Sequence, residues 1–425
     1  MPGDRIARVR VVVVDHDGGD HTLACLRALV ATEWPDADLD LVLVDNASTQ
    51  PVTATVRAEM PDVRIIESPL NLGFGGGCNL GMGDLDGIDA VALINDDATV
   101  DPGWLAPLAA ALDSDPALGA ACPKILLAST FREVTLHSEA HASGRGDRRP
   151  LGVRVAGARV GERDVWRDLR APRGTWGPEL QPGGRTAMWT DGDATLLVPV
   201  TDDAPTTVDL LLDAPEGRAV TARSGDEETV IVAGPDPAWL RVPLAGPTLR
   251  VVHSTGVEVT DDGFGVDRGW LEPDDGRFDA PNEVFAWCGG AVLLRARYLE
   301  EVGRFDESFF LYYEDLDLAW RGRTQGWRYM YVPTSVVHHV HAASGALGWA
   351  AKERRKERNR IVVLRRHAGL AAAARAWTRA TAATGGYVRR DAIAPALHGE
   401  RPRFEYVRAR TRALLGAARA LPFGG

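Results

Sequence analysis

The sequence has 425 residues, which is long enough for a large buried core and for more than one folding unit. Its content of 45% hydrophobic and 25% charged residues is ordinary for a soluble globular protein. The four cysteines are scattered without a CxxC pair, which argues against a zinc knuckle or disulfide scaffold and fits a reducing compartment. Because the apolar run Val9–Val14 is too short for a signal peptide and no run could span a bilayer, we expect a cytoplasmic protein.

The net charge of −11 is distributed unevenly along the chain. Residues 352–425 carry 18 basic and 5 acidic side chains, a local net of +13, whereas residues 1–351 carry 30 basic and 54 acidic ones. This basic tail favours an anionic partner, and we expect either peripheral contact with the inner face of an anionic membrane or a helical extension packed on the rest of the chain. Nucleic acid is disfavoured because no aromatic–basic interleaving is present.

Strands and helices alternate in the first part of the chain. Buried strands are predicted at Val9–Val14, Leu39–Val44 and Val63–Ile66, with a helix after each of the first two. This spacing predicts a parallel sheet with right-handed crossovers.

Acidic residues follow the predicted strands. Asp15 and Asp45 come directly after the first two, and Asn95-Asp96-Asp97 ends the apolar run Ala90–Ile94. Adjacent carboxylates repel each other unless a cation lies beside them, and the carboxyl ends of parallel strands are where open α/β sheets bind ligands. The pattern therefore predicts a metal ion with a phosphorylated ligand; an acidic turn before a helix starting at Asp101-Pro102 is the alternative.

The segment Asn71–Gly81 is rich in glycine, which lets a backbone approach a ligand and direct amides at phosphate. The dinucleotide pattern GxGxxG and the Walker pattern are both absent, so a flexible loop is the alternative interpretation.

Residues 129–280 differ in composition from the flanking segments. Short β-like runs separated by turn residues predict an inserted β-sandwich-like domain, which serves either as a structural insert or in carbohydrate or acceptor recognition. These runs are Thr195–Val200, Thr207–Leu212, Thr229–Ala233, Trp239–Leu244 and Leu249–His253.

Two polar clusters follow the insert. Glu314, Asp315 and Asp317 lie at a predicted helix N-terminus and indicate the edge of a pocket that holds a proton acceptor, although one acid there could serve only the helix dipole. Three histidines within residues 338–341 come after a strand and indicate a metal ligand or phosphate contact.

The order of these motifs resembles that of family 2 glycosyltransferases with the GT-A fold, especially the rhamnosyl- and galactofuranosyltransferase-like branch of bacterial cell-envelope synthesis. The resemblance covers residues 1–127 and 285–360, and leaves the insert out. The matching segments are Val11–Gly18, Val44–Thr49, Asn71–Gly81, Leu93–Asp97 with Asp101–Trp104, Gly289–Arg295, Gly303–Glu307, Glu314–Leu318, Arg321 and His338–Ser344.

The resemblance implies a role for each matching residue. Asp315 matches the general base, with Glu314 beside it; Asp97 matches the metal ligand of the DxD motif, which here begins with Asn95. One histidine of the cluster matches a further metal ligand: we favour His339, with His338 and His341 left open. The nucleotide-sugar site is expected to include Val14, Asp15, His16, Asp45, Asn71, Gly76, Asn79, Asn95 and Asp96. The acceptor pocket is expected to include Trp287, Gly289, Gly290, Asp317, Arg321, His338 and His341.

The sequence thus predicts an inverting glycosyltransferase that uses Mg²⁺ or Mn²⁺ to move a sugar from a dTDP- or UDP-linked donor to a hydroxyl of a glycan or lipid-linked acceptor. A nucleotidyltransferase is one alternative, disfavoured because residues 15–20 are acidic, and a carbohydrate-binding protein on a transferase scaffold is another. We expect donor-binding residues at 1–128, the insert at 129–280, the acceptor and catalytic part at 281–350 and a basic helical extension at 351–425.

Overall fold

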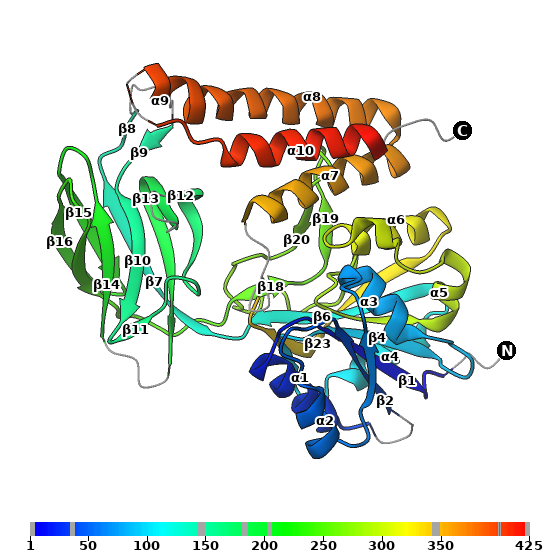
Figure 1. The fold of residues 1–425 in the computed structure, drawn as a ribbon. Coiled ribbons are helices and arrows are strands. Elements are labelled where there is room, and N and C mark those ends of the chain that lie inside the picture. The colour runs from blue at the N-terminus through cyan, green and yellow to red at the C-terminus, as the bar shows by residue number, and fades with distance from the viewer. Residues whose placement is uncertain are drawn as a thin grey trace.

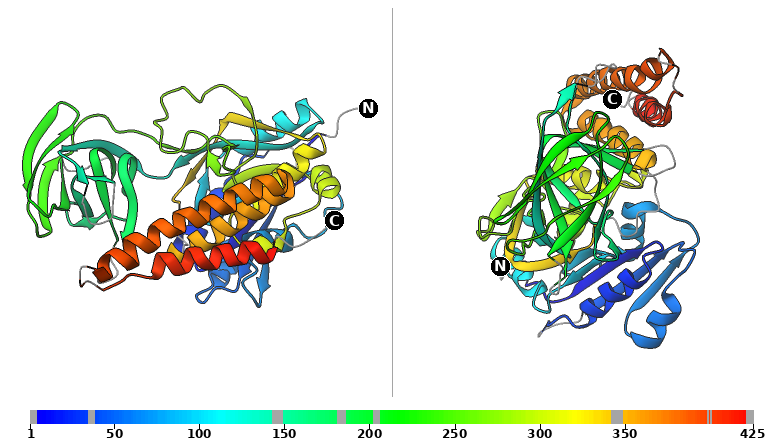
Figure 2. Two further views of the ribbon diagram at one scale, coloured as in Figure 1. Left: turned by 90° about the horizontal axis from the view of Figure 1, so that it is seen from above. Right: turned by 90° about the vertical axis from the view of Figure 1, so that its left-hand side faces the viewer.

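The computed structural model describes residues 5–34, 39–142, 149–180, 186–201, 206–341, 349–397, 399 and 401–420. It has three parts: an α/β unit around a ten-stranded sheet, a second sheet of nine strands, and C-terminal helices that extend over both (Figure 1). Seen from above, the long C-terminal helices lie side by side (Figure 2, left).

The first sheet has the order β21-β23-β6-β22-β4-β1-β2-β3, with β18 on β6 and β5 on β23. Strands β4, β1, β2 and β3 are parallel, β22 is antiparallel to both neighbours, and β23 is parallel to β6. The bounds are β1 Val9–Asp15, β2 Leu39–Asn46, β3 Arg64–Ser68, β4 Ala90–Asn95, β5 Ala98–Val100, β6 Leu118–Leu127, β18 Val252–Ser254, β21 Asn282–Val284, β22 Ala291–Arg295 and β23 Arg328–His339.

The register of the parallel strands brings the predicted polar residues to one edge. Asp15 pairs with Asp45 across β1 and β2, and Val14 pairs with Asn95 across β1 and β4. The apolar stretches that precede these residues are buried on both faces, as parallel strands covered by helices require. Three strand ends therefore deliver acidic or amide side chains to the same place.

The glycine-rich segment forms a helix, not the loop considered from the sequence. Helix α3 runs over Gly73–Met82, and two of its glycines face the sheet: a Cβ at Gly77 would overlap Val14, and one at Gly81 would overlap Val12. Glycine is needed here because the helix axis lies unusually close to the strands, which outweighs the poor helix propensity of the residue. The other helices of this unit are α1 Asp20–Val30, α2 Thr53–Glu59, α4 Leu105–Ser114, α5 Ala296–Val302 and α6 Glu314–Thr324, with the 3-10 turn η1 at Glu307–Phe309.

The inserted strands form an antiparallel β-rich unit in which the hydrogen bonds run continuously from strand to strand. Its order is β16-β15-β7-β13-β10-β14-β17, and it encloses its own apolar core. Its strands are β7 Thr130–Ser138, β10 Arg154–Val160, β11 Arg163–Asp164, β12 Arg170–Leu180, β13 Thr186–Val200, β14 Thr207–Asp213, β15 Arg218–Ser224, β16 Glu227–Ala233 and β17 Ala238–Pro243. Two small hairpins are β8 His141–Ala142 with β9 Pro150–Leu151, and β19 Val257–Val259 with β20 Gly265–Asp267.

The run Leu249–His253 was expected in this second sheet, but β18 belongs to the first. Val252 and Ser254 pair with Leu126 and Ile125 of β6. This return of the chain brings His253 to the α/β unit, where it contacts His339.

The basic tail forms helices α7 Trp349–His367, α8 Gly369–Val388, α9 Ala394–Leu397 and α10 Glu405–Ala420, with a π-helical turn at Arg389–Ile393. Helix α7 contributes Val362 and Val363 to the core beneath the first sheet, and His367 stacks on Trp320 of α6 with ring centroids 5.3 Å apart. The tail therefore packs on the α/β unit. Among the helices of the described ranges, none is long and apolar enough to cross a membrane.

Candidate active site

The first two strand ends are joined by a buried hydrogen-bond network. Asp15 Oδ1 accepts hydrogen bonds from the Gly18 amide at 2.9 Å and from Thr22 Oγ1 at 2.8 Å, while Ser48 Oγ lies 3.3 Å from Asp15 Oδ2. The Ser48 amide donates to Asp45 Oδ1 at 2.9 Å. Burial raises the pKa of Asp15. Asp15 is thus a fixed part of the wall, whereas Asp45 keeps its second oxygen for a ligand.

Asn46 is a further residue of this wall that the sequence analysis did not select. Its side-chain amide donates to Gly73 O at 3.1 Å, and its Oδ1 accepts from the Leu72 amide at 2.8 Å. It also lies 3.3 Å from Asn71 Oδ1. Asn46 therefore fixes the start of α3, and its position directly after Asp45 was the only signal for it.

Other residues expected in the nucleotide-sugar site are used differently. His16 contacts the Asn46 carbonyl oxygen at 3.0 Å, and Val14 lies under Gly77 of α3. Asn79 donates to Phe305 O at 2.9 Å and to Glu307, and Gly76 faces the same Glu307. The structure thus uses Asn79 and Gly76 to join α3 to the 305–307 segment.

The acidic pair at the end of β4 meets a histidine from β23. Asp96 and Asp97 are buried, and His339 Nε2 lies 2.7 Å from Asp97 Oδ1 and 3.3 Å from Asn95 Nδ2. Register brings them together, because His339 pairs with Ala98 and the Val340 amide donates to the Asp97 carbonyl at 2.9 Å. His338 points to Asp101 instead, at 3.3 Å, since neighbouring strand residues face opposite ways.

The donor set at this point suits a divalent cation. A carboxylate, a side-chain amide and an imidazole converge within hydrogen-bonding distance, which offers oxygen and nitrogen ligands acceptable to Mn²⁺ and, through the oxygens, to Mg²⁺. The imidazole nitrogen and the carboxylate now contact each other, and a cation between them would take the place of that contact. Asp97, His339 and Asn95 would hold it.

A second group of potential ligands adjoins the first through His253. His253 Nδ1 lies 2.8 Å from His339 Nδ1, and His253, Asp267 and Cys288 place ligand atoms within 4.8 Å of one another. Asp267 Oδ1 is buried without a hydrogen-bond partner among the described residues, and burial raises the pKa of Asp267 to about 6. Burial also raises the pKa of the Cys288 thiol, which disfavours the thiolate that a metal would need.

The sequence analysis missed His253 and Asp267. Neither lies in a motif, and both come from the stretch assigned to the insert. Only the pairing of β18 with β6 shows that they belong to this site. His341, expected near the pocket, completes the cluster, with its ring centroid 4.9 Å from that of His253 and 5.0 Å from that of Trp270. Burial lowers the pKa of His341 to about 4, so it is neutral at pH 7.

Asp315 and Glu314 differ sharply in their surroundings. Asp315 is partly accessible, and its carboxylate accepts hydrogen bonds from the Gly289 amide at 3.0 Å and the Leu316 amide at 2.8 Å. Glu314 is buried beside Gly75, and its Oε2 has no hydrogen-bond partner in the described part of the chain. Burial raises the pKa of both carboxyl groups, that of Glu314 to about 8, and the Gly289 and Leu316 amides oppose this shift at Asp315. Asp315 is therefore the better placed proton acceptor.

The turn Cys288-Gly289-Gly290 links Asp315 to His339, one of the candidate metal ligands. A Cβ at Gly289 would lie 3.2 Å from Asp315 Oδ2, and one at Gly290 would lie 3.4 Å from His339 Cε1. The Gly290 carbonyl also accepts from the Asn95 amide at 3.0 Å. Because both glycines lack side chains, the backbone passes directly between Asp315 and His339. Asp315 and His339 thus lie against neighbouring residues of one turn.

Three residues expected in the acceptor pocket lie elsewhere. Trp287 is fully buried and packs on Phe305, so it belongs to the core. Asp317 is also fully buried and accepts from Arg321 at 3.0 Å, Arg366 at 3.2 Å and His367 at 2.9 Å. Arg321 donates further to carbonyls of the 302–304 segment. Asp317 and Arg321 join α6 to α7 and do not face a pocket. Ser344 lies outside the described residues.

Replacing Glu314 with glutamine is expected to flatten the dependence of stability on pH. Burial, reinforced by Asp315, raises the pKa of Glu314 from 4.5 to about 8. Between these values the folded protein holds a proton that the unfolded chain releases, so the free energy of unfolding falls as pH rises, by up to about 1.4 kcal/mol per pH unit. Glutamine removes this contribution. Urea unfolding at about pH 5 and pH 8 gives the free energy of unfolding of the parent and the variant at each pH. If this free energy changes with pH equally in both proteins, Glu314 is charged when folded.

Comparison with known proteins identifies the first part of the chain. Residues 11–166 match the family model described as Glycosyl transferase family 2. The chain contains a family 2 glycosyltransferase domain. The match includes Asp15, Asp45 and Asp97 and ends before Asp315 and His339, whose roles rest on geometry. The family resemblance expected from the sequence is confirmed for residues 11–166, and the expected α/β unit with a mostly parallel sheet is present in the structure.

Curated relatives and solved structures are similar over different lengths. The N-acetylglucosaminyl-diphospho-decaprenol L-rhamnosyltransferase of Mycobacterium tuberculosis (strains CDC 1551 and H37Rv) is 33% identical over 104 residues, 24% of this chain and 34% of the relative. The chain thus matches about a third of the length of these relatives. GalNAc-T7, solved with UDP, GalNAc and Mn²⁺, has a TM-score of 0.44 at 12% identity and covers 85% of this chain and 48% of its own. The mannosyltransferase PcManGT of Pyrobaculum calidifontis, solved with GDP-Man and Mn²⁺, has a TM-score of 0.41 at 13% identity, covering 99% and 88%.

Proposed function

We propose that this chain is an inverting, metal-dependent glycosyltransferase that moves a sugar from a dTDP- or UDP-linked donor to a hydroxyl of a glycan or lipid-linked acceptor. The observation that carries the proposal is the Cys288-Gly289-Gly290 turn, whose two glycines lie against Asp315 and against His339, the partner of Asp97. Transfer with inversion needs these two functions on opposite sides of the anomeric carbon. The family 2 domain supports the same reaction class.

Asp315 has the position and hydrogen bonding that a base requires. The amides of Gly289 and Leu316 fix its carboxylate and stabilise its charged form against the effect of burial, so it would be oriented to accept the proton of an incoming hydroxyl. The protonated, buried Glu314 adds no charge to the site but keeps a negative Asp315 from sharing its surroundings with a second carboxylate. Asp315 would take the hydroxyl proton as the oxygen attacks the anomeric carbon.

At the other end, Asp97, His339 and Asn95 would hold Mg²⁺ or Mn²⁺. When bound, the cation would neutralise charge on the departing nucleoside diphosphate. Asp45, with one carboxylate oxygen already fixed by the Ser48 amide, would receive the nucleoside through the other. The burial of Asp96 and Asp97 excludes water from this end and strengthens each electrostatic contact made there.

The alternatives are less well supported. A nucleotidyltransferase does not need a general base facing a glycosidic centre, and residues 15–20 would present acids to a triphosphate. A carbohydrate-binding protein on a transferase scaffold would not need Asp97, His339 and Asp315 brought together at one turn. The name of the curated relatives favours a lipid-linked diphosphate as the acceptor class.

Calorimetric titration with UDP, dTDP and GDP, each with Mn²⁺ and again with EDTA, tests the donor site. We expect one nucleotide to bind, and only with the metal present. The anomeric configuration of the product, read by proton NMR, then tests inversion. Metal-independent binding, or no binding by any of the three nucleotides, would contradict the proposal, and retention of configuration would contradict the role of Asp315 as base.

A further inference from the structure

A second cavity, of about 480 Å³, lies between helices α7 and α10 and the chain at residues 308–310. Its lining includes neither Asp315 nor His339. Five arginine side chains line it: Arg354, Arg355, Arg358, Arg412 and Arg419. None of the lining residues that the structure describes is acidic. We call this cavity the arginine pocket.

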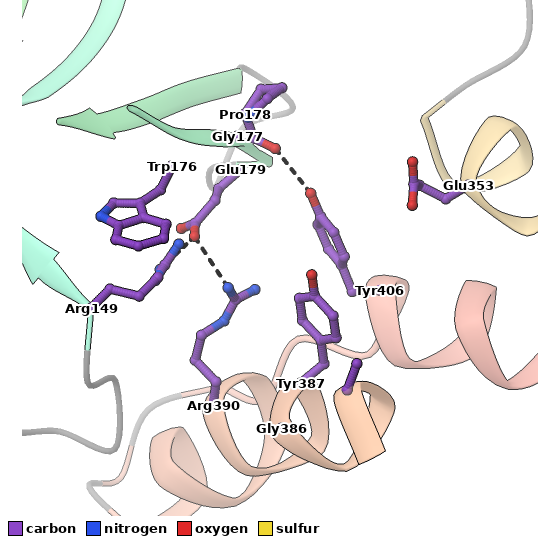
Figure 3. A pocket seen from close by; sticks show the side chains of 11 residues that line it. Arg149, Trp176, Gly177, Pro178, Glu179, Glu353, Gly386, Tyr387, Arg390 and Tyr406 are labelled. Atoms are coloured by element: carbon purple, nitrogen blue, oxygen red, sulfur yellow. Dashed lines mark hydrogen bonds and ion pairs between the residues drawn. The ribbon is translucent and has the colours of Figure 1, made fainter. Parts of the chain in front are cut away.

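The charge of the arginine pocket is unusual even for this basic tail. A neighbouring cavity of about 610 Å³, between β12 and the C-terminal helices, also contains arginines, but there Glu179 pairs with Arg149 at 2.7 Å and with Arg390 at 3.2 Å (Figure 3). Glu353 faces the same cavity. The charges in that cavity compensate each other, whereas those in the arginine pocket do not.

One nitrogen of these five guanidinium groups is also without a hydrogen-bond partner in the part of the chain that the structure describes. Arg355 Nη1 is buried and has no hydrogen-bond partner among the residues that the structure describes, while its guanidinium carbon lies 4.7 Å from the centre of the Phe310 ring. Burial and the neighbouring Arg354 lower the pKa of Arg355, and burial with Arg366 lowers the pKa of Arg358. A buried unpaired N–H and crowded positive charges are both costly, and an oxyanion would relieve both.

One wall of the arginine pocket is formed by residues 308–310, which precede the proposed base Asp315 by only a few positions. Phe310, Tyr312 and Tyr313 have positive φ values of 64°, 71° and 74°, and Glu314 and Asp315 follow them. The side-chain amide of Asn359, a lining residue from α7, donates to the carbonyls of Phe309, Leu311 and Tyr312 and holds this strained segment. A ligand in the pocket therefore contacts the segment that positions Asp315.

An apolar side chain stands at the same cavity. Leu415 of α10 lines the arginine pocket and is 55% exposed. A phosphate held by the arginines would thus have an exposed hydrocarbon surface beside it, which suits a ligand with a charged head and an apolar chain.

We propose that the arginine pocket binds the phosphate or diphosphate group of an amphiphilic ligand. Where the proposed glycosyl transfer holds, this ligand is the acceptor, and that part of the inference rests on the proposed function. Arginine suits this task because its planar donors match the oxygens of phosphate in pairs. The binding itself needs neither the cation nor the donor sugar.

The test is calorimetric titration of the full chain with inorganic pyrophosphate in EDTA, which removes any metal from the Asp97 end. The doubly substituted variant Arg412→Gln/Arg419→Gln changes exposed side chains of α10, so it is expected to keep the thermal midpoint of the parent. We expect its affinity for pyrophosphate to be at least about tenfold lower, because two charged donors are lost. Arg375→Gln removes one exposed charge from α8, outside the pocket, and is expected to stay within about twofold of the parent.

Two further probes identify the source of the phosphate. Dodecyl phosphate, used below its micelle concentration, should bind more tightly than pyrophosphate or inorganic phosphate if the ligand is amphiphilic; equal affinities would overturn the amphiphilic part. No pyrophosphate binding, or equal loss in Arg375→Gln and the double variant, would overturn the pocket. If the protein associates only with vesicles of phosphatidylcholine and phosphatidylglycerol, the proposal of a phosphate site is wrong and the basic helices are attracted to a membrane surface in general. A failed nucleotide titration beside successful pyrophosphate binding would remove the transferase proposal and leave the pocket standing.

Discussion

Replacing Asp315 with asparagine is expected to lower the turnover of sugar transfer by about 10²- to 10⁴-fold, the usual contribution of a general base. Asparagine keeps the size of the side chain and one of its two oxygens, so it retains one of the two hydrogen bonds that the Gly289 and Leu316 amides donate. It cannot take the proton of the attacking hydroxyl. Single-turnover rates with donor and acceptor measure the loss directly.

The matched control is Glu314→Gln, one residue away. Because Glu314 is buried and protonated at neutral pH, its amide analogue should lose far less turnover, within about tenfold of the parent. Metal-dependent nucleotide affinity should stay the same in both variants. If Asp315→Asn turns over like the parent, or if Glu314→Gln is the more damaged of the two, Asp315 is not the base.

Replacing Asp97 with asparagine is expected to weaken Mn²⁺ binding by at least about 100-fold, since a carboxylate ligand is lost from a buried site with few alternatives. Nucleotide affinity in the presence of Mn²⁺ should fall with it, to the level seen in EDTA. Titration of free Mn²⁺ by electron paramagnetic resonance gives the metal affinity without reference to turnover.

Asp101→Asn is the control for Asp97→Asn. Asp101 faces His338 at 3.3 Å, on the opposite side of β23 from the Asp97–His339 pair, so its loss removes a charge of the same kind without changing the proposed ligands. Unchanged Mn²⁺ affinity in Asp97→Asn, or an equal fall in Asp101→Asn, would move the metal site away from Asp97. The neighbouring His253, Asp267 and Cys288 would then be the group to test.

The alternation of strands and helices in the first part of the chain could be predicted because it depends on local periodicity. The register of β1 with β2 and β4 then had to bring Asp15, Asp45 and Asn95 to one edge, since parallel strands share their carboxyl ends. Helix α3 was harder. A flexible loop was an alternative interpretation of its glycines, because glycine has a low helix propensity. Their close packing on Val12 and Val14 becomes evident only when the sheet is known.

The parts of the site that depend on distant pairing could not be predicted. His253 reaches His339 because β18 returns to β6 after more than a hundred residues of intervening chain, and no local pattern announces that return. Asp317 looked like a pocket acid beside Asp315, but its partners Arg366 and His367 lie about fifty positions later. The sequence motifs thus indicated where the site lies, whereas long-range contacts determine which acidic residues can take part in it.

The clamp that Asn359 forms on the 309–312 carbonyls, together with the contacts of Arg366 and His367 to buried Asp317, also bears on synthesis of the protein. A nascent chain that has not yet released α7 from the ribosome has a buried Asp317 short of two of its partners, and the strained segment before Asp315 lacks its support. Strands β1 to β4 are made first and can pair before α7 exists. The segment around Asp315 is therefore held in place only after α7 has been made and has packed against it.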